Sequence, residues 1–253
     1  MTDTSVQPTA EGTPQLSQME RVVDVFTAPS KTFTDIKNGH RSWWMPFLIM
    51  VVLGYAFFYV VNSKVGMRQV SENQIKLSPK AEERMSQLTP EQREGQMKIS
   101  AYITEGFFLA SPVFVILMGV VISAVMLGTI NFGFGGKAKF GSVLAVWMYA
   151  MLPSLIKTLL AIIVIYAGSA PESFNISNPA PTNLGAFLSP TDTNPALYAL
   201  ATSIDAVTIW TLVLVGIGTS MVAGVKRSAG YIAAFGWWAV IVLVGVGYRA
   251  VAG

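Results

Sequence analysis

The segment INFGFGGKAKFGSVLAVWMYAMLP, residues 130–153, joins two long apolar runs through a short turn rich in glycine and lysine. The run before it, residues 107–130, carries no charged side chain over 24 residues, which is long enough for a helix to cross a bilayer core of about 30 Å. The second run follows directly. This pattern predicts a helical hairpin with a tight, basic, cytoplasmic turn, formed by Gly135, Gly136, Lys137 and Lys139.

The composition is typical of a membrane protein. Hydrophobic residues make up 52% of the 253 residues and charged residues only 12%, against roughly 25% charged in a typical soluble domain; the mean hydropathy is +0.52. Cysteine is absent and His40 is the one histidine, so thiolate sites and multi-histidine metal sites are excluded. We expect no metal, no cofactor and no catalytic residue, and the basic residues are too scattered to bind nucleic acid.

Apolar runs divide residues 43–251 into five predicted transmembrane helices. Their approximate bounds are 43–61, 107–130, 142–167, 196–225 and 229–251. Pro153 lies inside the third run, where proline predicts a helix kink. The expected fold is therefore all-α, an integral membrane bundle of five helices.

Two polar segments precede the first span. Residues 1–15 contain two prolines and few large apolar groups, and we expect them to be disordered. Residues 16–42 carry apolar residues at helical spacing between charged ones. They predict two short helices that either lie on the cytoplasmic leaflet as interfacial helices or pack, exposed, on the protein's own basic loops.

Residues 62–105 predict a small helical cap outside the cytoplasm. The patterns Ser78-Pro79 and Thr89-Pro90-Glu91-Gln92 are typical of helix N-termini. We therefore expect one helix over residues 79–87 and a second that runs from Pro90 toward the second span. The acidic and basic residues of the cap nearly balance, which is typical of a solvated surface.

The distribution of lysine and arginine predicts the orientation. Basic residues occupy the segment before the first span, the hairpin turn and the turn at Lys226-Arg227, whereas residues 168–195 contain none. The positive-inside rule then places the N-terminus in the cytoplasm and the C-terminus outside. We expect a multi-pass protein of the cell inner membrane.

Lys157 and Asp205 are the candidate functional residues within the spans. We expect them at similar depth, Lys157 about ten residues from the outer end of the third span and Asp205 about nine residues into the fourth. A lone charge at that depth costs several kcal/mol, so the two should pair, or Lys157 should snorkel to the interface. A pair either fixes helix register or couples ions in a transporter, and one isolated pair favours the structural role.

Three features together resemble a known family. They are VFTAPSKTF at residues 25–33 followed by WWMP at 43–46, the hairpin GGKAKF at 135–140 leading to YAMLP at 149–153, and five spans with a cytoplasmic N-terminus. These features resemble the Yip family, the multi-pass proteins named for interaction with Ypt/Rab GTPases, in its bacterial branch. The resemblance covers about residues 19–250 and implies a non-enzymatic integral membrane protein, without ligand residues to carry over.

The resulting hypothesis is a membrane scaffold or membrane-organising protein of the Yip-like type. Its expected partners are the lipid bilayer and a membrane protein or a second copy of the chain. The alternative is a small transporter or channel subunit that uses Lys157 and Asp205. An enzyme acting on lipids would need a polar cluster at headgroup depth, and we find none in the sequence.

Overall fold

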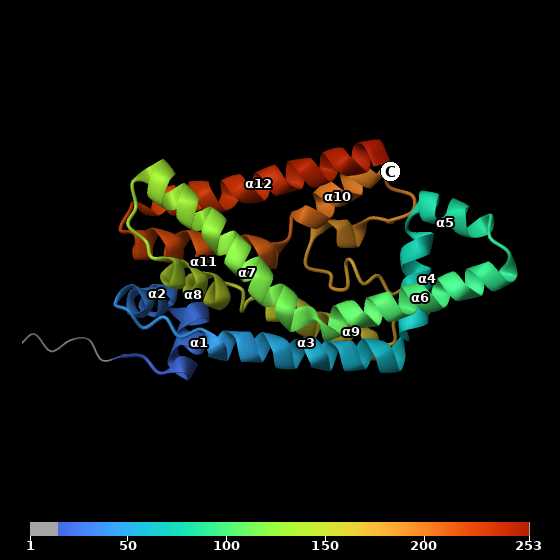
Figure 1. The fold of residues 1–253 in the computed structure, drawn as a ribbon, viewed down its shortest axis with the longest axis horizontal. Helices are drawn as coiled ribbons and strands as arrows, with labels where there is room; N and C mark the ends of the chain where they lie inside the picture. Colours follow the sequence, from blue (N-terminus) through green and yellow to red (C-terminus); the bar gives the residue numbers. More distant parts are fainter. Residues whose placement is uncertain (1–14, 253) are drawn as a thin grey trace, which may run out of the picture.

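Long helices run roughly parallel through most of this molecule, and a group of shorter helices extends from one end (Figure 1). The computed structural model describes residues 15–252, so the expected disorder of residues 1–15 lies outside the described residues apart from Gln15. The helices are α1 (Gln18–Thr27), α2 (Pro29–Lys37), α3 (Trp44–Lys64), α4 (Met67–Lys76), α5 (Pro79–Ser86), α6 (Pro90–Leu109), α7 (Ser111–Gly128), the π-helix η1 (Thr129–Gly133), α8 (Phe140–Ala150), α9 (Ser154–Tyr166), the 3₁₀ helices η2 (Pro171–Ser173) and η3 (Leu184–Phe187), α10 (Pro195–Ser203), α11 (Ala206–Ala223) and α12 (Arg227–Ala252).

Five helical segments of the described chain are long and apolar enough to cross a membrane. They are Trp44–Lys64, Ser111–Gly133, Phe140–Tyr166, Ala206–Ala223 and Arg227–Val251. Between residues 15 and 252 the β-structure is limited to an isolated bridge between Asn183 and Asp205. The predicted all-α membrane bundle is confirmed.

The prediction of an unbroken fourth span over residues 196–225 is wrong. α10 ends at Ser203, α11 begins at Ala206, and Asp205 between them has an extended backbone with φ −123° and ψ 126°. The Asp205 carboxylate accepts a hydrogen bond from the Thr208 N–H at 2.7 Å, so Asp205 is the N-cap of a new helix. The third span is also divided, because α8 ends at Ala150 and α9 starts after Pro153.

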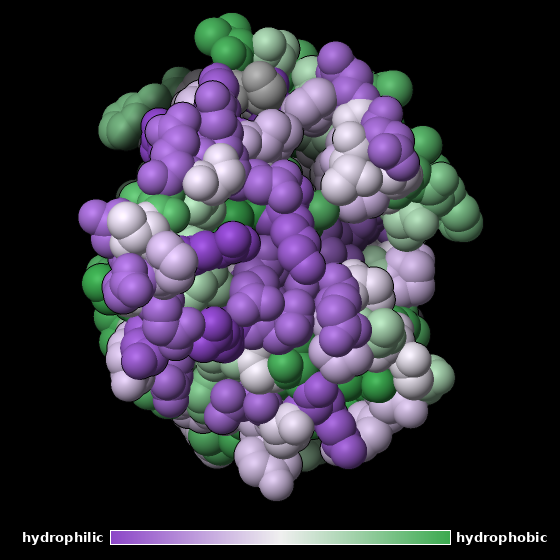
Figure 2. Space-filling model, turned by 90° about the vertical axis from the view of Figure 1, so that its right-hand side faces the viewer, coloured by the Kyte–Doolittle hydropathy of each residue, from purple (hydrophilic) through white to green (hydrophobic). Residues whose placement is uncertain are grey.

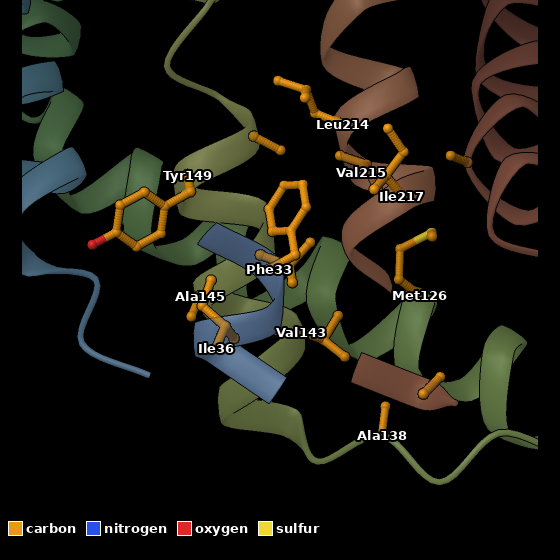
Figure 3. Close-up of a cluster of buried hydrophobic side chains, with 14 of the residues drawn as sticks. Phe33, Ile36, Met126, Ala138, Val143, Ala145, Tyr149, Leu214, Val215 and Ile217 are labelled. Carbon is orange, nitrogen blue, oxygen red and sulfur yellow. The ribbon is translucent and has the colours of Figure 1, made fainter. Parts of the chain in front are cut away.

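The two N-terminal helices pack on the core of the bundle, which corrects the expectation that they are exposed helices packed on the basic loops; their position at the cytoplasmic leaflet stays a prediction. Val25 in α1, and Phe33 and Ile36 in α2, have no solvent-exposed surface. Figure 3 shows the α2 side chains lying between those of α8 and α11, with Phe33 near the middle of the cluster. The apolar faces of α1 and α2 therefore pack on the spans themselves, and burial of this area stabilises the N-terminal end of the bundle.

The cap consists of α4, α5 and the first part of α6. Thr89 and Gln92 form the predicted capping box at the start of α6, whereas the Ser78 side chain makes no capping hydrogen bond to α5. α4 was not predicted from the sequence; its few apolar residues, including Met67 and Val70, pack on the C-terminal end of α3. The cap is therefore a folded layer on the bundle. We call this the cap end, and the end that carries α1 and α2 the N-terminal end.

Close contact between α11 and α12 requires glycine at two positions. A Cβ atom added to Gly230 would lie 2.0 Å from the Gly216 carbonyl oxygen, and one added to Gly216 would lie 2.5 Å from the Tyr231 ring. Both distances are far below van der Waals contact. Small residues of this kind let the backbones of two membrane helices approach closely.

We predict that Gly230→Ala lowers the thermal unfolding temperature of the detergent-solubilised protein. The added methyl group forces α11 and α12 apart, and overpacking of this kind costs about 1–3 kcal/mol. Gly236→Ala is the matched control in the same helix, because a Cβ atom there meets nothing within 4 Å. Equal melting temperatures for the two variants would contradict the close packing.

A second prediction concerns the pH dependence of the cap. Arg68 in α4 donates two hydrogen bonds to the Glu94 carboxylate in α6, at 2.8 and 2.7 Å, and these bonds lower the pKa of Glu94. A lowered pKa in the folded state means that the contact stabilises the cap fully above the unfolded value of about 4.3 and is lost as the pH falls through the folded value.

Spin labels on cysteines introduced into α4 and α6 will report this change, since the chain has no cysteine of its own. We expect the distribution of distances between the labels to broaden at acidic pH in the wild type. In Glu94→Gln the distribution should be broad at every pH. The control is Glu91→Gln, which removes an exposed carboxylate from the same helix. An acid transition that persists in Glu94→Gln would show that another group controls it.

Candidate functional site

Lys157 and Asp205 lie together in the structure. The Lys157 Nζ atom is 3.2 Å from Asp205 Oδ2, and the exposed fractions of the two side chains are 33% and 2%. The Thr182 hydroxyl donates a hydrogen bond to the same carboxylate at 2.5 Å, and the Thr208 N–H donates to Oδ1. Both oxygens of this buried carboxylate are therefore engaged within the protein.

The backbone around Asp205 is held by the loop of residues 168–194. The Leu184 N–H donates to the Ile204 carbonyl at 3.2 Å, and the Ala206 N–H donates to the Thr182 carbonyl at 3.0 Å. Along the axis of the bundle, most of this loop lies level with the last turns of α3 and α12 rather than beyond them (Figure 1). The loop therefore supplies the hydrogen bonds that the broken fourth span lacks, as a helix break in a membrane requires.

This geometry changes the expected depth of the pair. Asp205 precedes the first residue of α11, whereas the sequence reading placed it about nine residues inside a continuous helix. Lys157 lies in the first half of α9. Chemically, the arrangement joins three segments, α9, α11 and the loop, through one carboxylate. Thr182 was not predicted, because no sequence pattern distinguishes the one residue of a polar loop that hydrogen-bonds to a distant helix break.

The predicted hairpin turn lies at the opposite end, against the end of α11. Gly135 has a φ of +68°, which favours glycine. A Cβ atom on Gly136 would lie 3.0 Å from both the Ile130 carbonyl oxygen and the Ala223 Cβ. The Lys137 N–H donates to the Ala223 carbonyl at 3.0 Å. The turn is thus fixed to the last turn of α11.

Asn131 is a residue of this turn that the sequence reading missed. Its side-chain amide donates to the Ala138 carbonyl at 3.0 Å, and its carbonyl oxygen accepts from the Ala138 N–H at 2.9 Å. One amide side chain therefore closes the turn in place of a backbone pair. Lys137 and Lys139 on either side of Ala138 remain exposed.

A buried polar cluster at the N-terminal end was also missed. Arg21 has no exposed surface, and its Nε atom lies 2.5 Å from Asp35 Oδ2. Its Nη2 donates to the Leu16 carbonyl at 3.1 Å, and His40 Nδ1 lies 2.7 Å from Asp35 Oδ1. We call Arg21, Asp35 and His40 the Arg21 cluster. Arg21 lies one helical turn before the buried Val25, on the same face of α1. That shared face was the sequence signal from which burial of Arg21 could have been predicted.

The Arg21 cluster is tied to the membrane bundle through Tyr149 of α8. The Tyr149 hydroxyl donates to Gln18 Oε1 at 2.8 Å and lies 3.2 Å from the Ser42 carbonyl, to which Arg21 Nη1 also donates at 3.4 Å. Figure 3 shows this hydroxyl pointing out of the apolar cluster, toward the N-terminal segment. Apolar packing by Phe33 thus holds α2 on α8 and α11, while the hydrogen bonds around Arg21 join α1 to α8 through Tyr149.

Comparisons with known proteins give one match. Residues 23–248 match the Yip1 domain, from within α1 to the last turns of α12. A search of curated proteins and a search of solved structures each returned no match. The matched region includes the second half of α1, all of α2, the hairpin turn, the first four spans and most of the fifth, and it covers most of the chain. The predicted resemblance is confirmed: this multi-pass membrane protein belongs to the Yip1 domain family.

Proposed function

We propose that this protein is a non-enzymatic membrane scaffold that acts through protein and lipid contacts on its N-terminal end. The observation that carries the proposal is the burial of α1 and α2 in the bundle by Phe33 and the Arg21 cluster. Because these helices are fixed to the spans, the surface they expose has one defined shape. A preorganised surface binds a partner without the cost of ordering it.

The exposed groups of this end fit a negatively charged partner surface. Exposed cations come from three separate segments: α2, the hairpin turn and the start of α12; they are Lys31, Lys37, Lys137, Lys139, Lys226 and Arg227. Met19 and Val23 add an exposed apolar patch on α1, 56% and 53% exposed. The excess of cations supports placing this end, and the N-terminus, in the cytoplasm of a cell with an inner membrane. The C-terminus then lies outside.

The alternative role, an ion-coupled transporter that uses Lys157 and Asp205, has less support. The Asp205 carboxylate caps α11 and accepts hydrogen bonds from Thr182 and Thr208 in addition to its ion pair. A group engaged in this way is suited to hold a junction of segments, whereas a transported proton or ion needs a site that can be vacated. We therefore propose a structural role for the pair.

Variants that remove one or both charges of the pair test that structural role. We expect Lys157→Met alone to destabilise the protein by about 1–3 kcal/mol, because it leaves a buried carboxylate without its cation. Lys157→Met with Asp205→Asn should recover most of this loss, since asparagine retains the capping oxygen without the charge. The measurement is thermal unfolding in detergent. A proton-dependent flux into proteoliposomes that disappears in the double variant, with folding intact, would instead favour transport.

The scaffold role is tested by charge reversal at the N-terminal end. We expect Lys31→Glu with Lys37→Glu to remove the proteins that co-purify with the full chain in mild detergent, because the partner surface then meets like charge. Lys80→Glu with Arg84→Glu makes the same change on exposed α5 residues of the cap and should leave those proteins bound. Quantitative mass spectrometry of both samples is the measurement, and an identical set of partners from the two variants would refute the proposal.

A further inference from the structure

The cap end contains a cavity of about 740 Å³. The end of α4, the start of α5, the loop of residues 168–194, α10 and the last turn of α12 form its walls. Cavities that bind small molecules have volumes of about 300–1,000 Å³. The size of this cavity is therefore suited to a ligand.

Hydrogen bonds across the cavity walls preorganise them. Gln74 of α4 donates to Asn175 Oδ1 at 3.3 Å and accepts from the Ser177 hydroxyl at 2.8 Å. Asn178 donates to the Tyr198 hydroxyl of α10 at 3.3 Å. The loop is thus joined to the cap on one side and to α10 on the other, and all five side chains line the cavity.

The charges of the cavity favour an anion. Lys76 lies at one side and Arg249 at another, and Glu82 is the acidic lining residue. Within residues 15–252, neither Lys76 nor Arg249 takes part in an ion pair. Two cations, together with neutral amides and hydroxyls, supply hydrogen-bond donors of the kind that bind phosphate oxygens.

The cavity borders exposed apolar surface of the bundle. α10 turns Tyr198 and Thr202 toward the cavity, while its Leu197 and Leu200 are 54% and 41% exposed. The last turns of α12 add exposed apolar side chains, with Tyr248 68% exposed. Figure 2, which views this end, shows hydrophilic residues over the middle of the face and hydrophobic residues around its edge. A polar headgroup and two acyl chains would each meet matching surface here.

We propose that this cavity binds the anionic phosphate headgroup of a membrane lipid, with Lys76 and Arg249 as the phosphate ligands and the acyl chains on α10 and α12. The inference is independent of the scaffold proposal, which concerns the opposite end of the bundle. The same phosphate chemistry is available from a soluble phosphate ester. The position of the cavity beside apolar helix surface favours the lipid.

The test is a titration of the full chain in neutral detergent, followed by native mass spectrometry. The probes are phosphatidylglycerol, phosphatidylcholine with the same acyl chains, and glycerol 3-phosphate. We expect phosphatidylglycerol to bind at least about tenfold more tightly than phosphatidylcholine, and Lys76→Gln with Arg249→Gln to abolish that difference. The matched control, Lys80→Gln with Arg84→Gln, removes two exposed cap cations that do not line the cavity and should leave the preference intact.

Three outcomes would overturn the proposal. One is equal affinity of the wild type for the two lipids. Another is an equal loss in both double variants, which would indicate diffuse surface charge rather than a site. The third is binding of glycerol 3-phosphate as tightly as phosphatidylglycerol, which would assign the site to a soluble ester. Melting temperatures of all variants will show that they fold, and Arg249→Gln alone, at an exposed helix end, keeps the test valid if Lys76→Gln does not fold.

Discussion

Backbone groups that lie in lipid must find partners inside the protein, and this constraint explains both the course of the helices and their interruptions. Where the fourth span breaks at Asp205, the loop of residues 168–194 returns to supply backbone hydrogen bonds, and the carboxylate caps the new helix. Lys157 then neutralises that carboxylate. The ion pair is therefore a consequence of the break, and the break allows a polar loop to lie beside the cap-end parts of the spans. The cavity at the cap end is bounded by that loop.

The N-terminal end follows a different principle, because it combines apolar and polar contacts on the same helices. Phe33 and Ile36 pack on α8 and α11, while Arg21 and Asp35 form a buried pair beside them. A buried ion pair contributes little net stability, but it restricts which packing arrangements are acceptable. Together the two kinds of contact give α1 and α2 a single position on the spans. A scaffold needs such a position if its exposed residues are to match a partner.

The sequence predicted the fold well where the signal lies within one short segment of the chain. Long uncharged runs indicated the spans, the glycines and lysines of residues 135–139 indicated the hairpin turn, and the capping box at Thr89 indicated α6. It failed where distant segments supply the partners. The start of α11 depends on the loop near Thr182, and the buried Arg21 finds its partners in Asp35 of the next helix and in the carbonyls of Leu16 and Ser42. Hydropathy reports how apolar a segment is, and it carries no information on which remote group satisfies a polar atom within it.

The burial of α1 and α2 also has a consequence for biogenesis. α1 and α2 leave the ribosome before the spans on which they pack. Their contact residues Tyr149 in α8 and Leu214 in α11 are made more than a hundred residues later. Until the third and fourth spans have been made, Phe33 therefore lacks its apolar neighbours on α8 and α11 and Gln18 lacks the Tyr149 hydroxyl, whereas Asp35, the partner of Arg21, is already present. α1 and α2 therefore reach their full native contacts only after α11 has been made, and nascent chains released before that point would expose the apolar faces of the two helices to chaperones and proteases.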